Sequence, residues 1–212
     1  MRIRWHYSET MLCSAGPPGP EPASLAFADE SFMELAGGGF YVLAAAVFAP
    51  VDQGAARAAM LGLRGTRDTR KLHWNEMDIR QRVSAAREVA ALGGLHVVTV
   101  GAPVPNTRQE RARAMCLERL VTELHGYGVV ELFVESRTKE LDERDVKTII
   151  GARFHLPKGS RFHVDHARGA DEPLFWVADI VAGAVRAHHI GDPTYRRLLD
   201  DCVYEIDVLT GC

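Results

Sequence analysis

Cysteine is scarce in this chain, and no long apolar run is present. The four cysteines are widely separated and form no CxxC pair: Cys13, Cys116, Cys202 and Cys212. This distribution argues against a zinc ribbon or a disulfide framework and suits a reducing compartment. No apolar run reaches about 18 residues, so no membrane span is expected. The first residues, MRIRWHYSET, lack the apolar core of a signal peptide, and we therefore expect a cytoplasmic protein.

The chain also contains few lysines and has no net positive charge. Arginine outnumbers lysine 21 to 4, and the formal net charge is −3. A chain without a general excess of positive charge can bind nucleic acid only through a local basic patch. The arginine bias has two interpretations, genomic base composition and phosphate recognition by guanidinium groups, and we favour the first.

Several common catalytic motifs are missing. The sequence has no GxxxxGK[ST] phosphate loop, no GxGxxG after a strand and no GxSxG nucleophile elbow. Histidines occur as HVDH at 163–166 and as HH at 188–189, without an accompanying CxxC. A zinc site is therefore not expected, and we interpret His163 and His166 as surface or hydrogen-bonding residues.

What the sequence does contain is an alternation of strand and helix patterns after an initial hairpin. Residues 1–23 form a leader segment rich in Pro and Gly towards its end, and residues 193–212 form a C-terminal extension. Between them we expect strands, helices and a second hairpin: strands at 25–31, 40–48, 95–102 and 129–136; an amphipathic stretch at 71–92; helices at 108–126, 140–150 and 172–189; and the hairpin at 151–166. This order predicts a single α/β domain with a mixed sheet and flanking helices.

Four acidic residues occupy positions where α/β sheets commonly carry active or binding sites. Asp29 and Glu135 end strands, Glu76 begins a helical stretch, and Asp179 interrupts the apolar helix FWVADIVAGAV. Strand-end acids are often only turn residues, and acids at a helix start often complement the helix dipole. Asp179 is harder to explain in this way, because a carboxylate in an apolar helix needs a partner or a cation. Glu30 should point away from Asp29 and is interpreted as structural.

The order of these motifs resembles the bacterial and phage domain-of-unknown-function family 3800. The matching residues are Asp29-Glu30-Ser31, Lys71-Leu72-His73-Trp74 and Ala178-Asp179-Ile180-Val181-Ala182, within about residues 24–192. The resemblance implies an RNase H-like fold and either a metal-dependent nuclease or a relative that has kept only the fold. Three features depart from the family pattern: Phe32 follows Ser31, Glu135-Ser136 ends the later strand, and the strand LHVVTVG carries no acid.

The leading hypothesis is a nuclease that uses Mg²⁺ or Mn²⁺ to hydrolyse phosphodiesters of RNA or DNA. Asp29, Glu135 and Asp179 would bind metal, and Glu76 would be a fourth ligand or a water-orienting base. His73 would shuttle a proton. The candidate nucleic-acid contacts are Arg64, Arg67, Arg70, Lys71 and Arg137.

Two alternatives to this hypothesis stay open. One is a non-catalytic module that binds nucleic acid or a protein on the same fold. The other is a hydrolase of small nucleotide ligands, which the same acids would suit. The final residues, YEIDVLTGC, are either an added strand or a homodimer contact.

Overall fold

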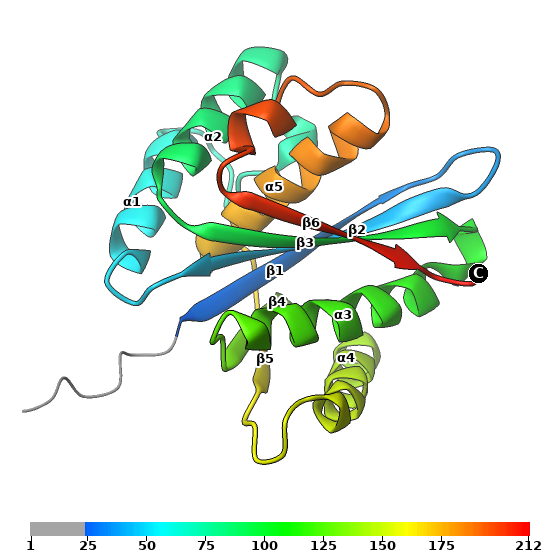
Figure 1. Cartoon of the computed structure of the whole chain (residues 1–212). Helices are drawn as coiled ribbons and strands as arrows, with labels where there is room; N and C mark the ends of the chain where they lie inside the picture. The colour runs from blue at the N-terminus through cyan, green and yellow to red at the C-terminus, as the bar shows by residue number, and fades with distance from the viewer. Residues whose placement is uncertain (1–23) are drawn as a thin grey trace, which may run out of the picture.

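The computed structural model describes residues 24–212, and the leader segment predicted for residues 1–23 lies outside them. The described residues form one mixed sheet in the spatial order β5-β4-β1-β2-β3-β6 (Figure 1). β1, β2 and β3 are antiparallel neighbours, whereas β4 is parallel to β1, β5 to β4, and β6 to β3. This arrangement confirms the predicted α/β class and fits an RNase H-like fold. The strands are β1 (Leu25–Met33), β2 (Gly39–Phe48), β3 (Leu95–Val104), β4 (Glu131–Glu135), β5 (His163–Ala167) and β6 (Val203–Leu209).

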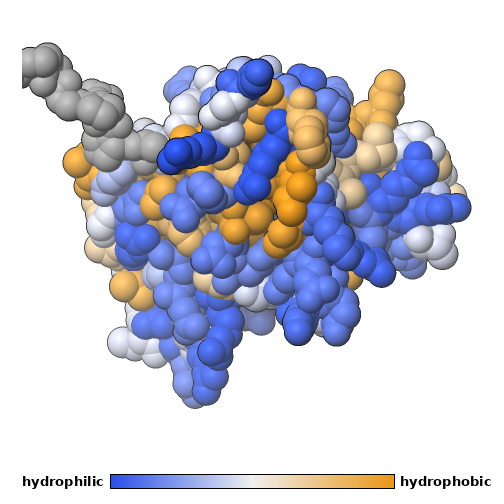
Figure 2. All heavy atoms as spheres, turned by 90° about the horizontal axis from the view of Figure 1, so that it is seen from below, coloured by the Kyte–Doolittle hydropathy of each residue, from blue (hydrophilic) through white to orange (hydrophobic). Residues whose placement is uncertain are grey.

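Helices cover both faces of the sheet. Helices α1, α2 and α5 lie on one face, and α3 and α4 on the other (Figure 1). Seen from the side of α3 and α4, the surface is mainly hydrophilic and carries a hydrophobic patch (Figure 2). No helix within residues 24–212 is long and apolar enough to cross a lipid bilayer. The helices are α1 (Gln53–Arg64), α2 (Ile79–Ala91), α3 (Gln109–Gly126), α4 (Lys139–Ala152) and α5 (Leu174–His189).

Side chains of β1 alternate between the two cores. Phe27 belongs to the core under α5 and stacks on Phe133 of β4, with ring centroids 5.2 Å apart. Ala28 belongs to the core under α3 and α4. Because successive strand residues point to opposite faces, Asp29 shares the face of Phe27 and Glu30 lies on the other. The prediction that the two acids point in opposite directions is confirmed.

The hairpin predicted over residues 151–166 is wrong. Helix α4 continues to Ala152, a 3-10 turn (η3) spans Arg153–His155, and only His163–Ala167 forms a strand. Ile149 and Ala152 are buried in the core under α3, so the helical pattern extends into the expected first strand. β5 then runs parallel to β4, and a parallel neighbour requires a crossover such as α4 rather than a tight turn.

The amphipathic stretch predicted from Lys71 is helical only from Ile79. The Asp78 side chain accepts the N–H of Gln81 at 2.8 Å, and the Gln81 side chain accepts the N–H of Asp78 at 2.9 Å. This reciprocal capping box starts α2 at that point. Ile79, the first residue of α2, is 70% exposed. Residues 71–77 instead form a loop with a 3-10 turn (η1, Trp74–Glu76).

The C-terminal part of the chain completes the sheet. Ala112, Cys116, Leu120 and Leu124 recur every four residues in α3 and are all buried, whereas His188 near the end of α5 is exposed. Residues 193–212 contain a 3-10 helix (η4, Arg196–Leu199) and β6, which pairs with β3. The extension therefore contains an added strand.

Candidate functional site

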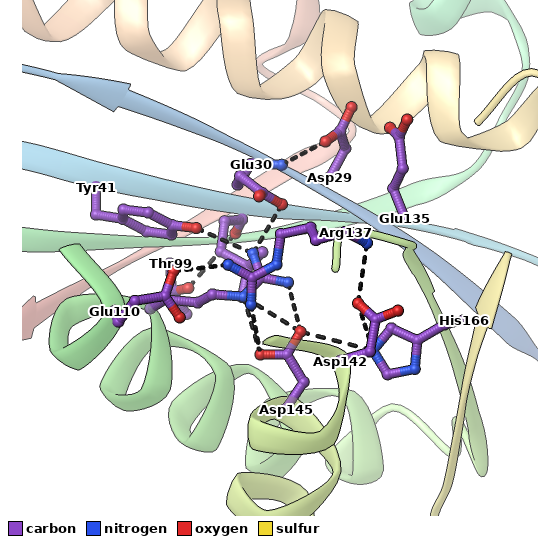
Figure 3. A network of polar contacts seen from close by, with 12 residues as sticks. Asp29, Glu30, Tyr41, Thr99, Glu110, Glu135, Arg137, Asp142, Asp145 and His166 are labelled. Carbon is purple, nitrogen blue, oxygen red and sulfur yellow. Dashed lines mark hydrogen bonds and ion pairs between the residues drawn. The ribbon is translucent and has the colours of Figure 1, made fainter. Parts of the chain in front are cut away.

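Asp29 and Glu135 lie beside each other on two parallel strands. Glu135 ends β4 as predicted, whereas the prediction that Asp29 ends a strand is wrong, because β1 continues to Met33. Ala28 of β1 pairs with Val134 of β4, so the next residue on each strand is one of the two acids. Both carboxylates point to the α5 face, as the close-up shows for the two side chains (Figure 3). The Asp29 carboxylate also accepts the N–H of Glu30 at 2.8 Å, which fixes its orientation.

Lys71 provides the cation between these carboxylates. Its Nζ lies 3.3 Å from Oδ2 of Asp29 and also forms an ion pair with Oε2 of Glu135. Its side chain is 18% exposed, so the ammonium is largely removed from water. The loop before α2 thus brings the lysine of the KLHW motif to the face of β1 and β4 where two predicted metal ligands lie.

Asp179 of α5 is buried and holds the same loop from the other side. Its Oδ2 accepts the backbone N–H of Trp74 at 2.6 Å and lies 3.4 Å from Nδ1 of His73. Gly183, one turn later, has no side chain, and the Trp74 ring packs directly on its backbone. A Cβ at position 183 would lie 2.2 Å from Cγ of the indole. The small residues around Asp179 therefore allow the KLHW loop to lie directly on α5.

The electrostatics of this cluster are set first by burial and then by the charges of its neighbouring carboxylates and Lys71. Burial raises the pKa of the Asp29 carboxyl well above its usual value; Lys71 opposes this, and Asp179, Glu30 and Glu135 add to it. Burial would lower the pKa of Lys71, but Asp29, Glu135 and Asp179 outweigh it and raise that pKa. Contact with Asp179 raises the pKa of His73. One ammonium therefore only partly compensates the charge of the carboxylates.

The remaining predicted residues are distributed around this cluster. Glu76 is exposed and lines a pocket of about 90 Å³ together with Lys71, His73 and Arg67. Arg70 is exposed on the same loop, and the structure does not place its side chain or that of Glu76 against the carboxylates. The Arg64 guanidinium lies over the Trp176 ring, 5.7 Å from its centroid.

Arg137 lies on the opposite face, in a polar network that the sequence analysis missed (Figure 3). Its guanidinium pairs with Asp145 at 3.1 Å and with Glu110 at 2.7 Å. The centre of the network is Arg113 of α3, whose side chain is 1% exposed and which contacts both Asp145 and Glu30 at 2.7 Å. A signal was present in the sequence, because Arg113 shares a helical face with the apolar residues four and eight positions later. An arginine on that face needs a buried acidic partner.

The donor set fits a hard divalent cation. Within residues 24–212 no three His, Cys, Asp or Glu side chains are grouped as a ready-made metal site. Three carboxylates nevertheless lie around Lys71, which contacts Asp29 and Glu135 and interacts with Asp179 through their charges. Carboxylate oxygens are the ligands that Mg²⁺ and Mn²⁺ prefer. The buried excess of negative charge favours a cation of higher charge than an ammonium.

Comparison with models of known protein families gave no match for this chain, and comparison with curated proteins gave none. The fold and the geometry of the site therefore carry the functional assignment. Within that geometry, Asp29, Glu135, Asp179, Lys71 and His73 are brought together by β1, β4, α5 and the loop before α2.

Proposed function

We propose that this protein is a divalent-metal-dependent phosphodiester hydrolase that acts on RNA or DNA, and that it belongs to domain-of-unknown-function family 3800. The observation that supports this most is the pair of neighbouring carboxylates on two parallel strands, Asp29 and Glu135, which already hold one cation and have Asp179 beside them. A bound Mg²⁺ or Mn²⁺ supplies an activated water and stabilises the leaving oxygen of a phosphodiester.

The chain's own residues have defined parts in this proposal. Asp29, Glu135 and Asp179 hold the metal, and the Trp74 N–H orients the Asp179 carboxylate. His73 exchanges protons with solvent, because its side chain is 43% exposed and its pKa is raised by Asp179. Glu76 orients water. Arg64, Arg67, Arg70 and Lys71 contact phosphates.

The proposal is tested by cleavage assays on variants of Asp29 and Glu30, two adjacent acids that point to opposite faces of the sheet, and of Asp179. Asp29→Asn and Asp179→Asn should abolish Mn²⁺-dependent cleavage of RNA and DNA oligonucleotides, because an amide keeps the shape and loses the charge. Asn at position 179 still offers an oxygen to the Trp74 N–H, so the loop stays on α5. Glu30→Gln is the matched control. This variant should keep its activity, because Glu30 points to the opposite face of the sheet from Asp29 and pairs there with Arg113. Full cleavage by folded Asp29→Asn would rule the proposal out.

The Lys71 ion pairs favour a second candidate, a non-catalytic binding module on the same fold. In that case the lysine stays permanently between Asp29 and Glu135 and holds the two carboxylates together. Lys71→Met separates the two candidates by titration calorimetry with Mn²⁺. In a metal enzyme the variant binds Mn²⁺ more tightly than the unmodified protein, because a competing cation is gone. In a binding module neither protein binds Mn²⁺, and the variant has a lower melting temperature.

A further inference from the structure

A groove extends from the carboxylate cluster along α2. It consists of three hollows of about 90, 330 and 440 Å³. The first hollow includes Lys71 and His73 and shares Arg67 and Gln81 with the second, and the second shares Arg80 and Ser84 with the third. Neighbouring hollows share lining side chains, so they follow one another from the site to the outer part of α2, and we call this row of three hollows the groove.

Positive charge accompanies this groove along its length. Arg67 lies where the first two hollows meet, Arg80 where the second meets the third, and Arg87 in the third. All three are exposed, and none forms an ion pair with another residue of the range 24–212. Two acids, Glu76 and Glu88, also line it, so the three arginines leave a small positive balance even without Lys71, whose charge is taken up by Asp29 and Glu135. Guanidinium groups in this arrangement suit a chain of phosphates.

Apolar side chains lie between the arginines. Ile79 is 70% exposed in the third hollow, half-buried Val83 also lines that hollow, and half-buried Leu63 lines the second. Such side chains can pack against the faces of unstacked bases and sugars, which only a single strand presents. A duplex keeps its base faces stacked inside and would leave Ile79 without an apolar partner.

We propose that this groove binds single-stranded nucleic acid and directs it along α2 to the carboxylate site. The proposal deepens the proposed function and rests on it for the reaction at the end of the groove. Arg80 and Arg87 contact successive phosphates outside the site, and neither lies at the carboxylates.

The experiment measures binding of a fluorescein-labelled oligothymidylate of about 12 nucleotides by anisotropy, in EDTA, across a range of salt concentrations. The Arg80→Gln/Arg87→Gln double variant should bind about tenfold more weakly than the unmodified protein. The slope of log affinity against log salt should fall by about 1.4, at about 0.7 for each lost contact with a single strand. Arg144→Gln on α4 is the matched control, because Arg144 is exposed on the opposite side of the sheet. The control should keep both the affinity and the slope.

Unchanged affinity and slope in the double variant would refute the proposal that the groove binds single strands. Tighter binding of a duplex of the same length would also refute it. Melting temperatures establish that each variant is folded, and surface changes of this kind alter stability by about 0.5 kcal/mol or less. The experiments distinguish an error in the groove proposal from an error in the hydrolase proposal. If the unmodified protein cleaves and the double variant binds equally well, only the groove is wrong. If single strands bind along α2 and no Mn²⁺-dependent cleavage occurs, only the hydrolase is wrong.

Discussion

Replacement of Arg113 by methionine removes the central cation of the network on the α3 and α4 face. The guanidinium lies 2.7 Å from Oε2 of Glu30 and 2.7 Å from Oδ2 of Asp145, and it donates to the Tyr41 hydroxyl at 3.0 Å. Methionine retains most of the side-chain length, so lost charge and hydrogen bonds, rather than an empty cavity, determine the effect.

The size of the stability loss depends on the contacts that Glu30 and Asp145 keep when Arg113 is replaced. Removal of one partner of a buried ion pair costs about 3–5 kcal/mol, because the remaining charge is buried without compensation. Asp145 keeps its contact with Arg137 at 3.1 Å, and the Glu30 side chain is 24% exposed and can be hydrated. We therefore expect Arg113→Met to lower the free energy of unfolding by about 3 kcal/mol, the lower end of that range. Domains of ordinary stability, about 5–15 kcal/mol, stay folded after such a loss.

Urea denaturation followed by far-UV circular dichroism measures this loss. Arg119→Met on the same helix is the matched control, because Arg119 is 51% exposed and pairs with Glu123 one turn away. Exposed pairs of this kind contribute about 0.3–0.5 kcal/mol. If Arg113→Met loses less than about 1 kcal/mol, or no more than Arg119→Met, the network does not stabilise the fold in the way inferred here.

Two further predictions concern the site itself. Gly183→Ala should lower the free energy of unfolding by about 1–3 kcal/mol and red-shift Trp74 fluorescence, because its Cβ would lie 2.2 Å from the indole. Gly62→Ala in α1, where nothing lies within 4 Å, should instead add about 0.5–1 kcal/mol, and a loss equal to that of Gly183→Ala would contradict the packing explanation. For Asp29, the raised pKa means that ionisation destabilises the folded protein, so this cost is absent below about pH 3.9 and grows as the pH rises towards the folded pKa. Asp29→Asn should therefore increase the stability of the metal-free protein at pH 8, by about 1.4 kcal/mol for each unit of pKa shift, and much less at pH 4; equal urea midpoints at pH 8 would refute this.

Local patterns in the sequence predicted most of the elements and part of the site. The pattern of residues 108–126 predicted helix α3, and the alternation of β1 placed Asp29 and Glu30 on opposite faces. The apolar surroundings of Asp179 indicated that it needs a partner, and in the structure its partners are the Trp74 N–H and His73. These properties depend on residues within one or two turns of each other, so the sequence is sufficient to predict them.

The same patterns failed where the partner lies far along the chain. The sequence alone determined which acids are candidates and which face of each element carries them. Only the tertiary structure decided that Lys71 lies between Asp29 and Glu135, that Arg137 pairs with Asp145 on the other face, and that β5 runs parallel to β4. These contacts join residues that are brought together by strand order and by helical crossovers. Periodicity tells which way a side chain points within its own element, and it carries no information on which distant element lies opposite.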